Sequence, residues 1–69
     1  MLAAERRAHV LTAVVDRGAV RVSDLANELE VSEMTIRRDL EYLETTGELS
    51  KVHGGAVRST ATTEARGVE

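Results

Sequence analysis

Two adjacent arginines, Arg37 and Arg38, are the side chains in this sequence best suited to recognising an anionic or polar partner. A guanidinium group is permanently charged and presents a planar set of donors, so it can bind a phosphate or pair with two acceptors on the edge of a guanine. Ser32 opens the same stretch, "SEMTIRRDL", and serine is a residue type that caps helix N-termini. A helix that begins there would direct its free amides, with the hydroxyls of Ser32 and Thr35, toward an anion. These residues predict a surface that binds phosphates and reads a base edge.

The helix predicted over residues 33–46 points the two arginines in different directions. At about 100° per residue, one face of this helix is apolar and is predicted to be buried, namely Ile36, Leu40 and Leu43. Arg38 lies opposite that face, Arg37 lies to its side, and Asp39 lies near the edge of the core. We expect Arg38 to meet a base, Arg37 to hold a phosphate, and Asp39 to anchor the helix through an ion pair or a cap.

The elements before this helix follow from apolar spacing and from helix-end signals. Residues 3–17 are predicted to form a helix with one apolar stripe, and Gly18 is expected to end it. Residues 19–22 alternate in a way that indicates a short strand or an extended linker. Ser23 is expected to be the N-cap of a short second helix. The buried face of that helix would be Leu25, Ala26 and Leu29.

The elements after the helix at residues 33–46 are predicted from the positions of glycines. Gly47 is expected to end the third helix. Residues 49–52 and 56–58 then flank His53-Gly54-Gly55, a pattern typical of a β-hairpin. Residues 59–69 have no periodicity and are predicted to be a linker or a disordered tail.

Together these elements predict a fold that is mainly α with a small β-hairpin, arranged as a three-helix winged helix-turn-helix. The domain would span residues 1–58, with the helix-turn-helix at about 20–39 and the hairpin, residues 49–58, as the wing. Tyr42 is the single aromatic residue, so the core must be built from Leu, Val, Ile and Ala.

The charge balance argues weakly against a nucleic-acid partner. The chain has 12 acidic and 9 basic residues and a net charge of −3, whereas nucleic-acid-binding domains are usually basic. Binding depends on the local field, however. We therefore expect four cations to gather on one side, Arg37, Arg38, Lys51 and Arg58, with Glu33 and Glu41 close to the same surface.

Enzymatic, metal-binding and membrane functions are not indicated. The chain has no cysteine, and His9 and His53 fall on different predicted elements, so neither a zinc site nor another cofactor is expected. No Ser-His-Asp spacing or carboxylate pair predicts an enzyme. The apolar stretch at residues 10–15 is too short to span a membrane, so we expect a soluble, cytoplasmic domain.

The segments "TIRRDL" and, downstream, "HGGA" resemble the N-terminal DNA-binding domain of the DeoR family of bacterial transcription regulators, over roughly residues 5–58. The resemblance implies that helix 33–46 reads the major groove of double-stranded DNA. Glu33, Met34 and Arg38 would then face bases. Ser32, Thr35 and Arg37 would face the backbone. The predicted DNA-binding residues are Ser32, Glu33, Met34, Thr35, Arg37, Arg38, Tyr42, Lys51, His53 and Gly54.

The resemblance also implies a homo-oligomeric regulator, commonly a repressor of sugar or nucleoside catabolism genes. A larger C-terminal domain would bind a phosphorylated sugar and oligomerise; it lies outside this sequence, which would be the DNA-binding part cut in the linker. Two positions depart from the family pattern. Lys51 stands where Arg is more frequent, and Glu30 stands where Gly or Asn is common, so Glu30 is expected to carry left-handed strain.

A second function stays open at this point. The acidic balance also fits a winged-helix module for protein interaction or dimerisation without DNA binding. In that case Arg37 and Arg38 would be dispensable.

Overall fold

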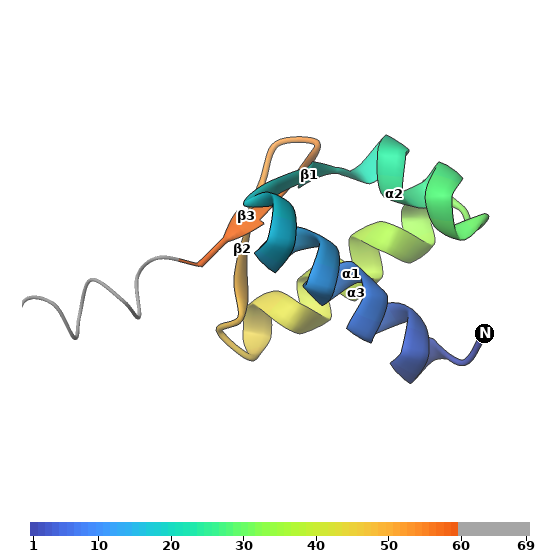
Figure 1. Ribbon diagram of the computed structural model, residues 1–69, viewed down its shortest axis with the longest axis horizontal. Helices are drawn as coiled ribbons and strands as arrows, with labels where there is room; N and C mark the ends of the chain where they lie inside the picture. The colour runs from blue at the N-terminus through green and yellow to red at the C-terminus, as the bar shows by residue number, and fades with distance from the viewer. Residues whose placement is uncertain (60–69) are drawn as a thin grey trace, which may run out of the picture.

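Three helices and three short strands make up residues 1–59, the part of the chain that the structure, a computed structural model, describes (Figure 1). The elements follow in the order α1 (Ala3–Arg17), β1 (Ala19–Arg21), α2 (Val22–Leu29), α3 (Glu33–Thr45), β2 (Leu49–Val52) and β3 (Gly55–Arg58). This order confirms the predicted three-helix winged helix-turn-helix. The linker or tail predicted for residues 59–69 lies, from residue 60 onward, outside the described residues.

The ends of α1 and α3 lie close to where the sequence signals predicted them. α3 starts at Glu33 and ends at Thr45, one residue before the predicted end. Ser32 is its N-cap, because the Ser32 Oγ accepts a hydrogen bond of 3.1 Å from the Thr35 amide. Gly18 and Gly47 follow α1 and α3 with φ angles of 84° and 81°, which glycine adopts without strain.

The prediction that Ser23 caps α2 is wrong. α2 begins at Val22, and Arg21 occupies the N-cap position without a side-chain hydrogen bond. The Val22 amide, one of the first helix amides that have no partner within the helix, donates instead to the carbonyl of Gly54, at 2.9 Å. The Val22 side chain is buried, which favours its place inside the helix. This bond ties the wing turn to the start of the helix-turn-helix.

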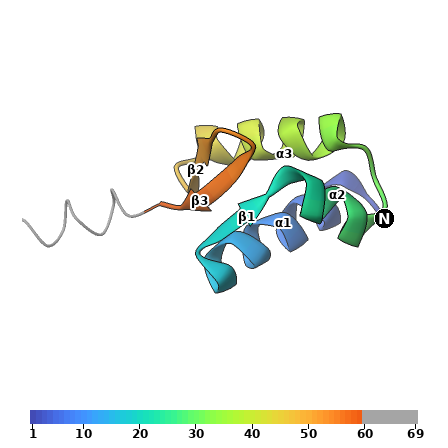
Figure 2. The same ribbon diagram turned by 90° about the horizontal axis from the view of Figure 1, so that it is seen from above.

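The hairpin is part of a three-stranded antiparallel sheet with the strand order β1-β3-β2. The segment left open as strand or linker is therefore a strand over Ala19–Arg21, with Val20 paired to Ala56. On the other side of β3, Lys51 pairs with Ala56. The sheet lies at the end of α3, and β2 packs against that helix (Figure 2).

Gly55 is a strand residue rather than part of the turn, because it pairs with Val52 on β2 and with Arg21 on β1. A Cβ atom added at Gly55 would lie 2.0 Å from the carbonyl oxygen of Val20. Only glycine allows β1 and β3 to approach this closely. The turn is thus His53-Gly54, and Gly54 has a φ of 77°.

The core gathers apolar side chains from all three helices and the sheet. Its most fully buried large members, each at most 2% exposed, are Val10, Val14, Leu25, Ile36, Leu40 and Leu49. The predicted core face of α3 is confirmed, since Ile36, Leu40 and Leu43 are all buried. Figure 2 shows α1 and α2 on one side of α3, whose opposite side is not covered by another helix or strand of residues 1–59.

One buried ion pair joins α1 to α3. Asp39 is 2% exposed, and its carboxylate accepts hydrogen bonds from Nε and Nη2 of Arg6, the second at 2.8 Å. The hydrogen bond to Asp39 raises the pKa of Arg6, against the smaller lowering by desolvation. The expectation that Asp39 anchors α3 through an ion pair is confirmed.

We predict that Arg6→Ala lowers the free energy of unfolding by about 3 kcal/mol, because it leaves the Asp39 carboxylate buried without its partner. Urea denaturation followed by circular dichroism measures this loss. Arg17→Ala is the matched control, since Arg17 bonds Glu28 at an exposed position and should lose much less. Equal losses in the two variants would contradict the anchoring role of Asp39.

Gly55→Ala should destabilise the domain by about 3 kcal/mol or more, because the new Cβ meets backbone that cannot move aside. Gly47→Ala separates this steric effect from backbone strain. Gly47 has a positive φ and open space around it, so its replacement should cost only about 1–2 kcal/mol. Thermal unfolding compares the two, and a smaller loss for Gly55→Ala would reject the close approach of β1 and β3.

Candidate nucleic-acid interface

The side of α3 that faces away from α1 and α2 presents a polar surface, and one cation on it has no partner within residues 1–59. Glu33, Met34, Arg37 and Arg38 are exposed, and Met34 is 55% exposed, so it is not a core residue. Within residues 1–59, Arg38 makes no side-chain hydrogen bond or ion pair. Its guanidinium group is therefore available to a ligand.

The N-terminal end of α3 carries the two predicted hydroxyls. Ser32 is exposed and Thr35 is half-buried, and their oxygens lie 3.0 Å apart. Both stand at the positive end of the helix dipole, where backbone amides are free to bind an anion.

The turn between α2 and α3 determines the direction in which the N-terminal end of α3 points. Glu30 has a left-handed conformation, with φ 59° and ψ 46°, as expected from its place in the turn. The Val31 amide closes the turn by donating to the carbonyl of Ala26, at 3.0 Å.

A hollow of about 230 Å³ between α3 and the wing brings together cations that are far apart in the sequence. Arg37 reaches it from α3, and Lys51, His53 and Gly54 reach it from the hairpin. Arg37 also bonds Glu33 one turn earlier, at 3.2 Å. Four of the predicted contact residues thus border one concave surface.

Lys51 fastens the wing to α3. Its Nζ lies 3.2 Å from a carboxylate oxygen of Glu41, and its backbone amide donates to Glu44 at 3.0 Å. Both partners are on α3, and the backbone contact with Glu44 holds the wing beside the exposed face of the helix. The sequence predicted Glu41 near this face but not its pairing with Lys51.

Tyr42 lies on the other flank of α3, where an arginine of α1 meets it. The guanidinium carbon of Arg7 is 4.4 Å from the centre of the Tyr42 ring, within the range of a cation–π interaction. Sequence reasoning missed Arg7. The available signal was its spacing from Val10 and Val14, at i+3 and i+7, which places it on the side of α1 that faces α3.

Arg58 does not join the other cations, which corrects the expectation that it gathers with them. Its Nη1 donates to the carbonyl of Val15, at 2.7 Å, and its backbone amide donates to Gly18. The last carbonyls of a helix lack partners within the helix, and Arg58 satisfies one of them at the end of α1.

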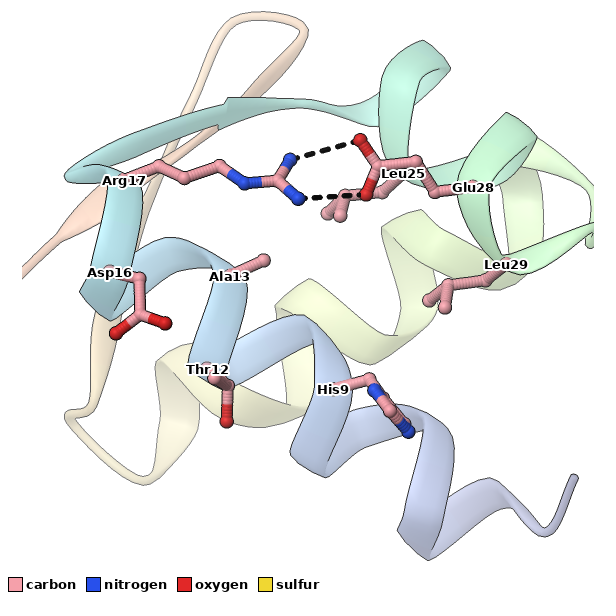
Figure 3. Close-up of a pocket in the computed structure, with 8 residues that line it drawn as sticks. All are labelled: His9, Thr12, Ala13, Asp16, Arg17, Leu25, Glu28 and Leu29. Atoms are coloured by element: carbon pink, nitrogen blue, oxygen red, sulfur yellow. Dashed lines mark hydrogen bonds and ion pairs between the residues drawn. The ribbon is translucent and has the colours of Figure 1, made fainter.

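Several acidic side chains lie away from the exposed face of α3. Glu28 on α2 accepts two hydrogen bonds of 3.0 Å from Arg17 on α1, beside a hollow between these two helices (Figure 3). The hydrogen bond from Arg17 lowers the pKa of Glu28. Glu28 therefore adds no unpaired negative charge next to the candidate interface.

This geometry defines the class of the protein. Two helices joined by a tight turn, the second exposed and capped by a serine, with a hairpin fastened beside it, form a winged helix-turn-helix domain of the kind that binds double-stranded DNA. Residues 6–62 match the family described as the DeoR-like helix-turn-helix domain, and the chain belongs to that family.

Proteins with similar sequences are named as transcriptional regulators or repressors. The chain is 51% identical over 57 residues to an uncharacterized HTH-type transcriptional regulator, YulB, of Bacillus subtilis, covering 83% of this chain and 22% of that protein. It is 44% identical over 57 residues to a lactose phosphotransferase system repressor of Staphylococcus epidermidis, covering 83% and 23%. A putative galactitol utilization operon repressor of Escherichia coli is 44% identical over 54 residues, covering 78% and 48%.

The chain therefore spans less than half of the length of each of these relatives. No solved structure matches it. Of the helices in residues 1–59, none has the length and apolar content needed to span a bilayer. In the same part of the chain, His, Asp and Glu side chains form no group of three that could hold a metal ion.

We predict that Arg38→Ala and Arg37→Ala weaken DNA binding in different ways. Arg38→Ala should cost about 1–3 kcal/mol on a cognate duplex and relax the preference at one base pair, because a paired hydrogen bond to a base is lost. Arg37→Ala should weaken all duplexes alike, because a phosphate contact carries no sequence information. Fluorescence anisotropy against a panel of single-base variants measures both, and the same pattern for the two variants would contradict the assignment.

Proposed function

We propose that this domain binds a specific operator as the DNA-reading part of a repressor of sugar or nucleoside catabolism genes. The observation that carries the proposal is the exposed Arg38, which has no ion-pair partner within residues 1–59 and lies on the face of α3 flanked by the wing cations and by the Arg7–Tyr42 pair. The family membership and the repressor names of two relatives support it.

In this proposal α3 enters the major groove, whose width of about 12 Å accepts a helix with its side chains. Arg38 pairs with guanine, Glu33 accepts a hydrogen bond from the amino group of cytosine, and Met34 contacts a thymine methyl group. These three side chains supply the sequence preference.

Phosphates on both sides of the groove are bound by residues that flank α3. Ser32, Thr35 and the first amides of α3 hold one strand. Arg37, Lys51 and the wing turn His53-Gly54 border the hollow on one flank. On the other flank Tyr42 and Arg7 reach the opposite backbone. Arg7 joins the predicted contact residues on this ground.

The rest of the regulator supplies the partner copy and the signal. We propose that the full-length protein is a homo-oligomer that acts in the cytoplasm, and that its remaining part binds a sugar phosphate. The share of each relative that this chain covers leaves room for such a part. Two copies on two half-sites would give tight binding, whereas one domain binds weakly. Regulation would work through DNA occupancy, without catalysis and without a cofactor.

The competing function, a protein-interaction or dimerisation module, gains no support from a particular observation. It was suggested by the acidic balance, but the net charge does not say where the charges lie, and Glu28, for example, lies on the α1 and α2 side, paired with Arg17.

The affinity of the domain for duplex DNA should fall steeply as salt rises. Each phosphate neutralised by Lys or Arg releases counterions, which contributes about −0.9 to the slope of log K against log salt concentration. Anisotropy titration of a duplex of mixed sequence, repeated at several salt concentrations, measures the slope. A flat response would reject DNA binding. Selection of bound sites from a random DNA pool by the full-length protein would then identify the operator.

A further inference from the structure

The two cations that border the wing hollow are already paired with carboxylates of α3. Arg37 Nη2 lies 3.2 Å from Glu33, and Lys51 Nζ lies 3.2 Å from Glu41. Arg38 has no such partner within residues 1–59. The proposed DNA surface therefore carries its own counterions, and they neutralise the phosphate-binding cations but not the base-reading one.

Both pairs are exposed, so they can exchange partners. The Glu41 side chain is 62% exposed and the Lys51 side chain 33% exposed, and the Glu33–Arg37 pair is about half exposed on each side. Water screens such pairs and they contribute little to folding. A phosphate oxygen that approaches Lys51 can thus replace Glu41 without disturbing the core.

The displaced carboxylates remain next to the DNA. Glu41 lies one turn beyond Arg37 and Arg38, at i+4 and i+3, on the outward side of α3. Glu33 lies one turn before Arg37. When Lys51 and Arg37 bind phosphates instead, both carboxylates are left close to the polyanion. Their repulsion lowers the affinity of every complex that depends only on phosphate contacts.

From this partner exchange we infer that Glu41, acting through Lys51, and Glu33, acting through Arg37, limit the affinity of the single domain for DNA. The inference rests on the proposed DNA-binding function. Glu41 lowers the affinity for all duplexes equally, whatever their sequence. Glu33 also faces the bases, so its effect depends on the sequence it meets. A domain limited in this way binds weakly to DNA of unrelated sequence, where it contacts only phosphates. Its occupancy of an operator then depends on base contacts and on a second copy of the domain.

The decisive variant is Glu41→Gln in the full chain, which keeps the shape of the side chain and removes its charge. Its affinity for a fluorescein-labelled duplex of mixed sequence should rise about two- to fivefold, the range of an exposed ion pair. Glu48→Gln is the matched control, because Glu48 is exposed and forms no ion pair in the described residues. It reports the gain from removing one negative charge elsewhere on the domain, which should be smaller.

A double-mutant cycle tests whether Glu41 acts through Lys51. In a Lys51→Met background, Glu41→Gln should give a smaller gain than in the wild-type background, because only the repulsion between Glu41 and the DNA, and no longer the competition for Lys51, is then removed. An equal gain with and without Lys51 would overturn the inference, as would a loss of affinity in Glu41→Gln. That loss would mean that Glu41 serves to hold the wing in place. Circular dichroism checks that each variant is folded.

The two proposals fail in different ways. A wild-type chain without salt-dependent duplex binding would reject the proposed function and this inference with it. A chain that binds DNA, but in which Glu41→Gln matches Glu48→Gln, would keep the function and reject only the role of Glu41.

Discussion

The ion pair between Arg6 and Asp39 fixes, against α1, the same rotation of α3 about its own axis that the apolar face of the helix favours. Consecutive helix residues differ by about 100° in direction, so the three charged residues from Arg37 to Asp39 must point three ways. Asp39 is buried against α1, and Arg38 is thereby directed outward and Arg37 toward the wing. A burial cost that would be high for a lone carboxylate is offset by two hydrogen bonds from one guanidinium group. The same contact that stabilises the core orients the candidate interface.

The wing is placed by backbone contacts that depend on its two glycines. Gly55 lets β3 lie close to β1, and the carbonyl of Gly54 receives the first amide of α2. The backbone amide of Lys51 also holds β2 against α3 by donating to Glu44, while its side chain pairs with the exposed Glu41. The hairpin is thus attached to both helices of the helix-turn-helix, so the hollow between wing and α3 has a defined shape before any ligand arrives.

An acidic domain can bind a polyanion when its charges are separated in space. Arg17 and Glu28 neutralise each other on the α1 and α2 side, while Arg38 on α3 has no ion-pair partner among residues 1–59. The face of α3 is still not strongly cationic, because Glu33 and Glu41 lie on it. Local placement, rather than the net charge of −3, determines what the surface can attract.

The sequence by itself determined the features that depend on short-range spacing. The apolar periodicity of α3, the Ser32 cap and the outward direction of Arg38 all follow from neighbours within a few residues, and each agrees with the structure. Only the tertiary structure decided the third strand β1, the start of α2 at Val22, the Arg7–Tyr42 contact and the diversion of Arg58 to α1. Each of these joins residues that are distant in the chain. A local pattern leaves such partners open, because many long-range pairings satisfy the same hydrogen-bonding groups and charges until packing selects one of them.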